Sequence, residues 1–245
     1  MKFLFTSSNL MRFLALWTAL ASLFLFVVAA LFMPPNARAV MFMATGVTVI
    51  WIGLGGIGMW KTRAWVRVMV QRLPLPGLVT FILFCTFLAL LEEGVTVSMT
   101  NLAPVFGVPL GAAYITASAN YLDVVLLHSV VVFVPMFVAW AWMLNRWEIL
   151  PNIAFLVFGF TGFLLETAFS GSLNVLQLGF WIFVYGWMIY LPAYCFPGRE
   201  GRKPLKPWHY PILLFFPILC AIPVAAIIST LHPTPIHFPP IPPDT

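Results

Sequence analysis

Five ionisable side chains lie within or at the edge of strongly apolar segments of this chain: Glu92, Glu93, Asp123, His128 and Glu166. An ionisable group at the centre of a bilayer costs about 2.5–3.5 kcal/mol, so such residues often mark a functional cavity. Carboxyl groups held close together in a low-dielectric site share protons, which leaves one of them neutral as a general acid. A nearby histidine relays or accepts that proton. The five residues are therefore predicted to be catalytic, in adding or removing water across a double bond or in hydrolysing a lipidic substrate.

These five residues also have a plainer interpretation. The carboxylates could be solvated near the lipid headgroups at helix ends, and the histidine could simply satisfy an interhelical hydrogen bond. The two interpretations differ in whether the side chains share one cavity. Sequence leaves both open.

Helical spacing separates the two adjacent glutamates. At 100° per residue, Glu92 shares a stripe with Thr96, and Glu93 shares the next stripe with Asn101. We therefore expect only one of the two glutamates to face a common cavity. Asn101 and Asn120 flank the uncharged loop after the glutamates, and we predict that they bind substrate.

The sequence predicts no cofactor and leaves a metal ion open. Two glutamates and a histidine are plausible ligands, but no HxxxH or ExxH spacing accompanies them. The three cysteines, Cys85, Cys195 and Cys220, form no CxxC pattern, so we expect small apolar side chains rather than disulfides or metal ligands.

Composition places the chain in a membrane. Hydrophobic residues make up 62% of the sequence and charged residues 8%, whereas roughly a quarter of the residues of a soluble domain are charged. Apolar runs of about 20 residues without period-2 alternation favour helices over a β-barrel. Although the net charge is +5, the basic residues flank apolar segments, so we expect no nucleic-acid partner.

The chain is predicted to be all-α, a single bundle over residues 1–231 with a proline-rich tail over 232–245. We expect seven transmembrane helices, at 10–33, 40–60, 75–102, 122–144, 150–169, 173–195 and 210–231. The first segment is longer than the apolar core of a signal peptide, so we expect it to be retained. Residues 61–72 are expected at the membrane surface, and Pro135 is expected to kink the fourth helix.

Charge asymmetry predicts the orientation of these seven helices. Every Lys and Arg except Arg38 falls on the side of the N-terminus. The positive-inside rule then places the N-terminus in the cytoplasm and the C-terminal tail outside, in the cell membrane. This topology puts the five ionisable residues in the outer half of the bundle. It also excludes the orientation of seven-helix receptors and retinal pumps.

Some motifs resemble those of the carotenoid biosynthesis hydratases, polytopic membrane proteins that add water to the terminal double bond of acyclic carotenoids. The matching residues are Glu93, Phe106-Gly107, Tyr114, Val134-Pro135 and Trp140. The resemblance implies a hydration without cofactor, in which Glu93 donates a proton to the alkene and Asp123 or Glu166 orients water. It also implies that Tyr114 lies among the substrate-binding residues, and that the substrate is an isoprenoid or another membrane lipid. The paired glutamates are similar to those of glutamate-dependent intramembrane proteases, but the later histidine motifs of that family are missing.

Two alternatives to an enzyme follow from the same sequence. In the first, the chain is an accessory or scaffold subunit of a larger membrane complex, which binds other subunits through the glycine-rich second segment, the aromatic sixth segment and the proline-rich tail. In the second, it is a small transporter whose acidic cluster binds protons or cations. No internal repeat between the two halves supports the transporter.

Overall fold

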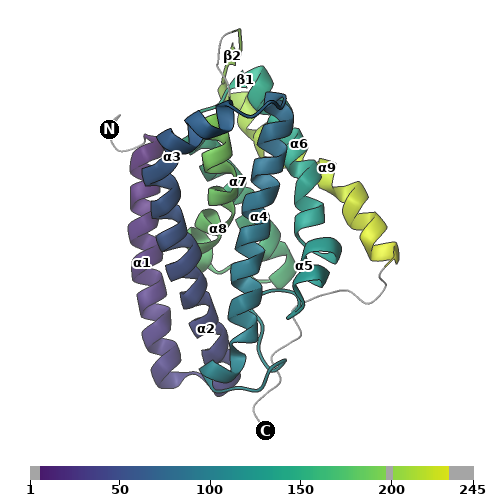
Figure 1. The fold of residues 1–245 in the computed structure, drawn as a ribbon. Helices are drawn as coiled ribbons and strands as arrows, with labels where there is room; N and C mark the ends of the chain where they lie inside the picture. The colour runs from purple at the N-terminus through teal and green to yellow at the C-terminus, as the bar shows by residue number, and fades with distance from the viewer. Residues whose placement is uncertain (1–5, 197–200, 232–245) are drawn as a thin grey trace.

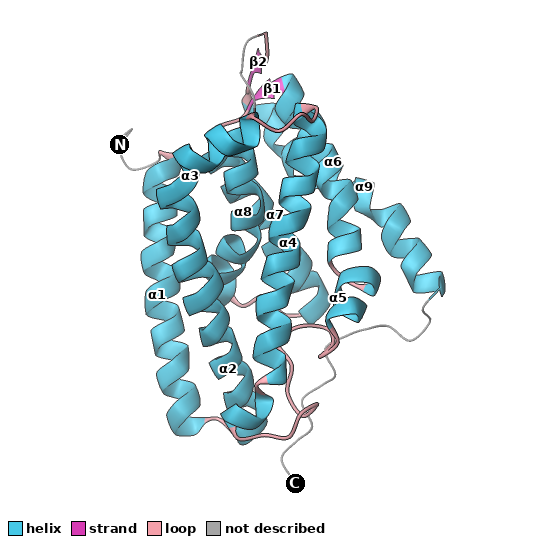
Figure 2. Cartoon of the chain, in the orientation of Figure 1, coloured by secondary structure: helices cyan, strands magenta, loops and turns pink. Residues whose placement is uncertain are grey.

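The computed structural model describes residues 6–196 and 201–231, which form an all-α bundle (Figures 1 and 2). The helices are α1 (Ser7–Phe32), α2 (Pro35–Val47), the π-helical η1 (Thr48–Gly55), α3 (Gly56–Gln71), α4 (Gly77–Asn101), α5 (Tyr121–Leu127), α6 (Val130–Arg146), α7 (Pro151–Ser170), α8 (Leu178–Cys195) and α9 (Tyr210–Leu231). Short 3₁₀ turns are η2 (Ala103–Phe106), η3 (Val175–Gln177) and η4 (Pro207–His209). Within the described residues, six helices are long and apolar enough to cross a membrane, or seven if α5 and α6 count as one bent span. The all-α prediction is confirmed, and the helices are compatible with a polytopic membrane bundle.

Local sequence explains where several helices begin and end. Thr6 caps α1 by accepting a hydrogen bond from the backbone N–H of Asn9 at 3.3 Å. Prolines begin α2 and α7, at positions where the missing N–H has no helical partner. Gly171 ends α7 with a φ of 65°, a left-handed conformation that glycine adopts without strain.

The second predicted segment is part of one uninterrupted helix of 37 residues, from Pro35 through η1 to Gln71. At 1.5 Å per residue this helix is longer than the hydrocarbon core, which is about 30 Å thick. Its C-terminal part, α3, lies at one end of the bundle beside β1 (Trp147–Glu148) and β2 (Lys203–Pro204), as Figure 1 shows. Residues 61–72, expected at the membrane surface, therefore continue the preceding helix rather than form a separate one.

Most of the described Lys and Arg residues lie at the end formed by α3, β1 and β2, which we call the basic end. β1 and β2 pair as a two-residue parallel bridge between the connection after α6 and the one after α8. Arg38 lies in the first turn of α2, at the opposite end of the bundle (Figure 1). The described residues thus keep the charge asymmetry of the sequence along one axis.

The fourth predicted segment is broken at His128 and Ser129. The axes of α5 and α6 differ by 44° across this break. The backbone N–H of Ser129 reaches back to the carbonyl of Val124 at 2.9 Å, which closes a wider turn than an α-helix allows. Our prediction placed a kink at Pro135, but Pro135 lies inside α6 and the break comes earlier.

α8 is the central helix, and its aromatic side chains lie inside the bundle. Phe183, Tyr185, Trp187 and Tyr190 are all buried. α7 and α8 approach closely at glycines, because a Cβ on Gly159 would lie 2.3 Å from the carbonyl oxygen of Ile182. Most of the aromatic sixth segment therefore belongs to the core of the bundle. Residues 232–245, the predicted proline-rich tail, lie outside the described residues.

Candidate functional site

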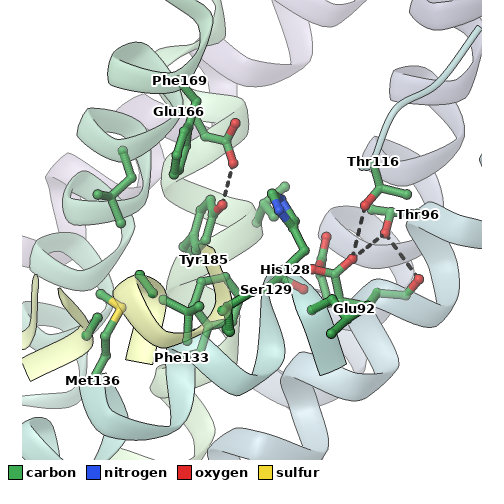
Figure 3. Close-up of a pocket in the computed structure, with 18 of the residues that line it drawn as sticks. Glu92, Thr96, Thr116, His128, Ser129, Phe133, Met136, Glu166, Phe169 and Tyr185 are labelled. Atoms are coloured by element: carbon green, nitrogen blue, oxygen red, sulfur yellow. Dashed lines mark hydrogen bonds between the residues drawn. The ribbon is translucent and has the colours of Figure 1, made fainter. Parts of the chain in front are cut away.

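A cavity of about 430 Å³ lies among α4, α6, α7, α8 and α9, closed on one side by the loop before α5 (Figure 3). We call it the acidic cavity, because Glu92, Glu93 and Glu166 all line it. His128 lines it as well. Four of the five predicted catalytic residues are thus brought together from three separate segments of the chain.

Glu93 is held by hydroxyl groups. Thr96, one turn further along α4, donates a hydrogen bond to its Oε2 at 3.1 Å, and Thr116 donates from the loop at 3.3 Å. The hydroxyl of Ser129, at the break between α5 and α6, lines the same cavity and donates a hydrogen bond to the carbonyl of Val124 at 3.2 Å. Hydroxyl groups from α4 and from the loop therefore fix one carboxylate, as a positioned acid or base requires.

Glu92 lines the same cavity as Glu93, and the side chains are only 3% and 6% exposed. Our expectation that only one of the two faces the cavity is wrong. α4 packs against both α6 and α8, and Glu92, Glu93 and Thr96 line the cavity from this helix. An angular separation of 100° therefore still leaves both carboxylates on its wall.

The third carboxylate is paired with a tyrosine. The Tyr185 hydroxyl of α8 donates a hydrogen bond to Oε1 of Glu166 on α7. Close glycine packing positions the ring, since a Cβ on Gly162 would lie 2.2 Å from its Cγ. Tyr185 is not among the site residues predicted from the sequence. Because Tyr185 lies on a helix rich in aromatic residues, its sequence position does not distinguish it from the others. The signal that could have identified it is a hydroxyl group on the helix face that packs against Glu166.

His128 lies between the two groups of carboxylates in the view of Figure 3, with Glu166 and Tyr185 on one side and Glu92 on the other. It ends α5, and its ring centroid is 6.5 Å from that of Phe169. The three glutamates are close enough for their charges to interact. A proton on any one of them therefore affects the others.

Asp123 lies outside the acidic cavity. It belongs to the first turn of α5, where it accepts a hydrogen bond from the Ser118 hydroxyl at 3.3 Å. Asn120 caps the same helix by accepting from the backbone N–H of Leu122 at 3.0 Å. These two predicted site residues therefore hold the start of α5.

Asn101 also has a structural contact. Its amide donates to the carbonyls of Val97 and Ala119, both at 2.9 Å, which ties the end of α4 to the loop. Tyr114 lines a second cavity of about 300 Å³ instead. That cavity lies between α1, α2 and the start of α8, and it shares Ile115 and Trp181 with the acidic cavity. Two side chains thus form the common wall of the two cavities.

The rest of the acidic cavity is mostly apolar, and several of its lining residues beside α9 are exposed. Ile222, Ala225 and Ile228 of α9 line it, and Figure 1 shows the C-terminal half of α9 diverging from the other helices. At this side Phe169 is 69% exposed and Ile222 is 53% exposed. In a bilayer, these exposed apolar side chains face hydrocarbon. On this side the cavity is therefore bordered by exposed apolar side chains.

Among residues 6–196 and 201–231, no group of three His, Cys, Asp or Glu side chains is arranged to hold a metal ion. The three cysteines are free thiols, and Cys85 and Cys195 are buried.

Comparison with known proteins yields no relative, since no family model, no curated protein and no solved structure matches this chain. Any functional conclusion therefore depends on the cavity itself.

Proposed function

We propose that this chain is an integral membrane enzyme that carries out acid/base chemistry on an apolar substrate, an isoprenoid or another membrane lipid. The observation that supports this most is the acidic cavity. It combines three interacting carboxylates and a histidine with an apolar wall and an opening beside α9. A charge solvated at a helix end does not require an enclosed cavity. An apolar substrate does require one, because its hydrocarbon part must be kept from water.

Within this proposal, Glu93 is the proton donor. Its two hydroxyl partners, Thr96 and Thr116, fix the carboxyl group, and its neighbour Glu92 lies in the same wall. Glu166, held by Tyr185, lies on a different helix and orients a water molecule. We assign to His128, which lines the same cavity, the return of the proton to Glu93 after each turnover.

The reaction we favour is addition of water across a carbon–carbon double bond. Glu93 transfers a proton to one alkene carbon, which leaves a carbocation at the other. Water adds to that carbon, and its surplus proton goes to Glu166. Atoms balance without a redox partner. The resemblance to carotenoid hydratases points to the same reaction, although Glu93 is the only one of its matching residues that lines the acidic cavity.

The test is mass spectrometry of lipid and pigment extracts from cells that lack the gene, complemented with the intact chain, with Glu93→Gln or with Asp123→Asn. Asp123→Asn is the matched control, because it removes a carboxylate outside the cavity. We expect an unsaturated precursor to accumulate in the deletion strain and with Glu93→Gln, and to disappear with Asp123→Asn. If no lipid differs between the deletion and the intact strain, the enzyme is refuted and an accessory subunit becomes the better hypothesis.

We also propose that the basic end faces the cytoplasm and that the chain resides in the cell membrane with its C-terminus outside. The positive-inside rule supports this orientation. Pro74→Cys, in the connection after α3, and Ser172→Cys, after α7, place exposed thiols at opposite ends. A membrane-impermeant maleimide added to intact cells should label only Ser172→Cys. Labelling of Pro74→Cys alone would reverse the orientation.

A further inference from the structure

A third cavity, of about 290 Å³, lies at the basic end, away from the acidic cavity. It is formed where α3 ends, α4 begins and α8 ends. Its wall is largely hydrocarbon and aromatic, with Val70, Leu73, Phe81, Phe84 and Phe196 among the lining residues. A wall of this kind accommodates an acyl chain.

Arginines lie at the edge of this cavity. Arg67 is close enough to the lining residue Cys195 for an electrostatic interaction, and its guanidinium carbon is 5.9 Å from the Tyr194 ring centroid. The guanidinium carbon of Arg202 is 4.9 Å from the ring centroid of Phe196, another lining residue. Two arginines, Arg67 and Arg202, thus lie next to residues at the edge of this apolar cavity.

Among the described residues, acidic side chains are nearly absent from this end, where only Glu148 in β1 lies. One guanidinium nitrogen of Arg63, one turn before Arg67 on α3, is buried without a hydrogen-bond partner. Arg63 thus has a donor left for an acceptor outside the described residues.

The position of α3 sets the depth of these arginines. Trp65, Val68 and Met69 are exposed on the same helix, next to Arg67. A helix with basic and apolar residues interleaved in this way lies in the membrane interface, where its charges meet lipid headgroups. Arg67 is thus placed at phosphate level, and the pocket lies against the acyl chains.

We propose that this cavity is a binding site for an anionic phospholipid of the surrounding membrane. One acyl chain occupies the pocket between α3, α4 and α8, and the phosphate lies between Arg67 and Arg202. Guanidinium groups suit this role because they bind phosphate oxygens in pairs and stay charged at all relevant pH values. The site does not depend on the proposed reaction, since it shares no lining residue with the acidic cavity.

The experiment is native mass spectrometry of the purified full chain in a mild detergent, titrated with phosphatidylglycerol or with phosphatidylcholine. We expect the wild type to retain phosphatidylglycerol on the order of tenfold more tightly, because each basic residue near the surface adds an attraction for an anionic headgroup. The double variant Arg67→Gln/Arg202→Gln should lose this preference. The matched control Arg12→Gln/Arg38→Gln removes as many charges from α1 and α2 and should keep it.

A second variant tests the pocket separately from the charge. Thr80 lines the cavity, and Thr80→Phe fills it without changing the charge. Retention of phosphatidylglycerol should fall severalfold, while circular dichroism of the variant stays unchanged. The proposal is overturned if the wild type does not discriminate between the two lipids. It is equally overturned if glycerol 3-phosphate, which has the headgroup chemistry but no acyl chain, displaces the lipid at equal concentration.

Discussion

Replacing Gly159 by alanine tests whether the α7–α8 contact positions the candidate site. The added Cβ would lie 2.3 Å from the carbonyl oxygen of Ile182 and 2.9 Å from its Cα. Both atoms are backbone, so no side-chain rotation relieves the clash. Because ordinary contacts need about 3.5 Å, α7 and α8 must separate by roughly 1 Å. Glu166 and Tyr185 lie on these two helices, so the separation also affects their hydrogen bond.

Two opposing terms determine the size of the effect. Alanine favours a helix interior over glycine by about 1 kcal/mol. Overpacking a close contact costs about 1–3 kcal/mol, and a backbone neighbour puts Gly159→Ala toward the upper end. We therefore expect a net loss of about 1–2 kcal/mol in the free energy of unfolding. Gly58→Ala, where a Cβ meets no atom within 4 Å, is the control and should be neutral or more stable by up to about 1 kcal/mol.

Both variants can be compared with the wild type by equilibrium unfolding in mixed micelles of mild and denaturing detergent, followed by far-UV circular dichroism. Gly159→Ala should unfold at a lower fraction of denaturing detergent than Gly58→Ala. Equal midpoints would refute the close α7–α8 approach. They would also remove the argument that this approach positions Tyr185 against Glu166.

Two further substitutions separate the site from its support. Tyr185→Phe deletes the hydroxyl group that donates a hydrogen bond to Glu166. We expect turnover of the lipid substrate to fall about 10–100-fold, as for other residues that orient a reacting group, with little change in the unfolding midpoint. Unchanged turnover would exclude the Glu166–Tyr185 pair from the reaction. Asn120→Ala removes the cap of α5 and should lower stability by about 1 kcal/mol, measured by the same unfolding assay, while turnover persists. Loss of turnover at full stability would instead return Asn120 to the substrate site.

Sequence was sufficient for the helices because hydrophobic length is a strong signal in a membrane. Segment 75–102 corresponds to α4 and segment 210–231 to α9, within a few residues at each end. The break after α5 was missed because it has no proline. The break depends instead on the wide turn closed by the hydrogen bond from the Ser129 N–H to the Val124 carbonyl, and no sequence pattern predicts such a turn. Proline is the familiar sequence signal for a helix kink, but Pro135 lies within the continuous helix α6.

The candidate site was predicted in part, for physical reasons that differ between residues. Glu92, Glu93 and Glu166 were found because a carboxylate within apolar sequence is costly and therefore conspicuous. Tyr185 was missed because tyrosine is common in membrane helices, so only its packing against α7 distinguishes it. Asp123 was grouped with the three glutamates because a helix-end carboxylate and a cavity carboxylate are alike in sequence, but it lies outside the cavity.

The separation of charge along the bundle has an electrical consequence. Basic side chains collect at the end with α3, β1 and β2, whereas Glu92, Glu93 and Glu166 lie beyond the midpoints of α4 and α7, toward the other end. The basic charge is therefore concentrated at one end of the bundle. Moving one elementary charge across a potential of 100 mV changes its energy by about 2.3 kcal/mol. In the orientation proposed above, a potential that is negative inside would therefore favour keeping the basic end on the inner side. A proton that reaches the glutamates from the opposite face crosses less than half of the field.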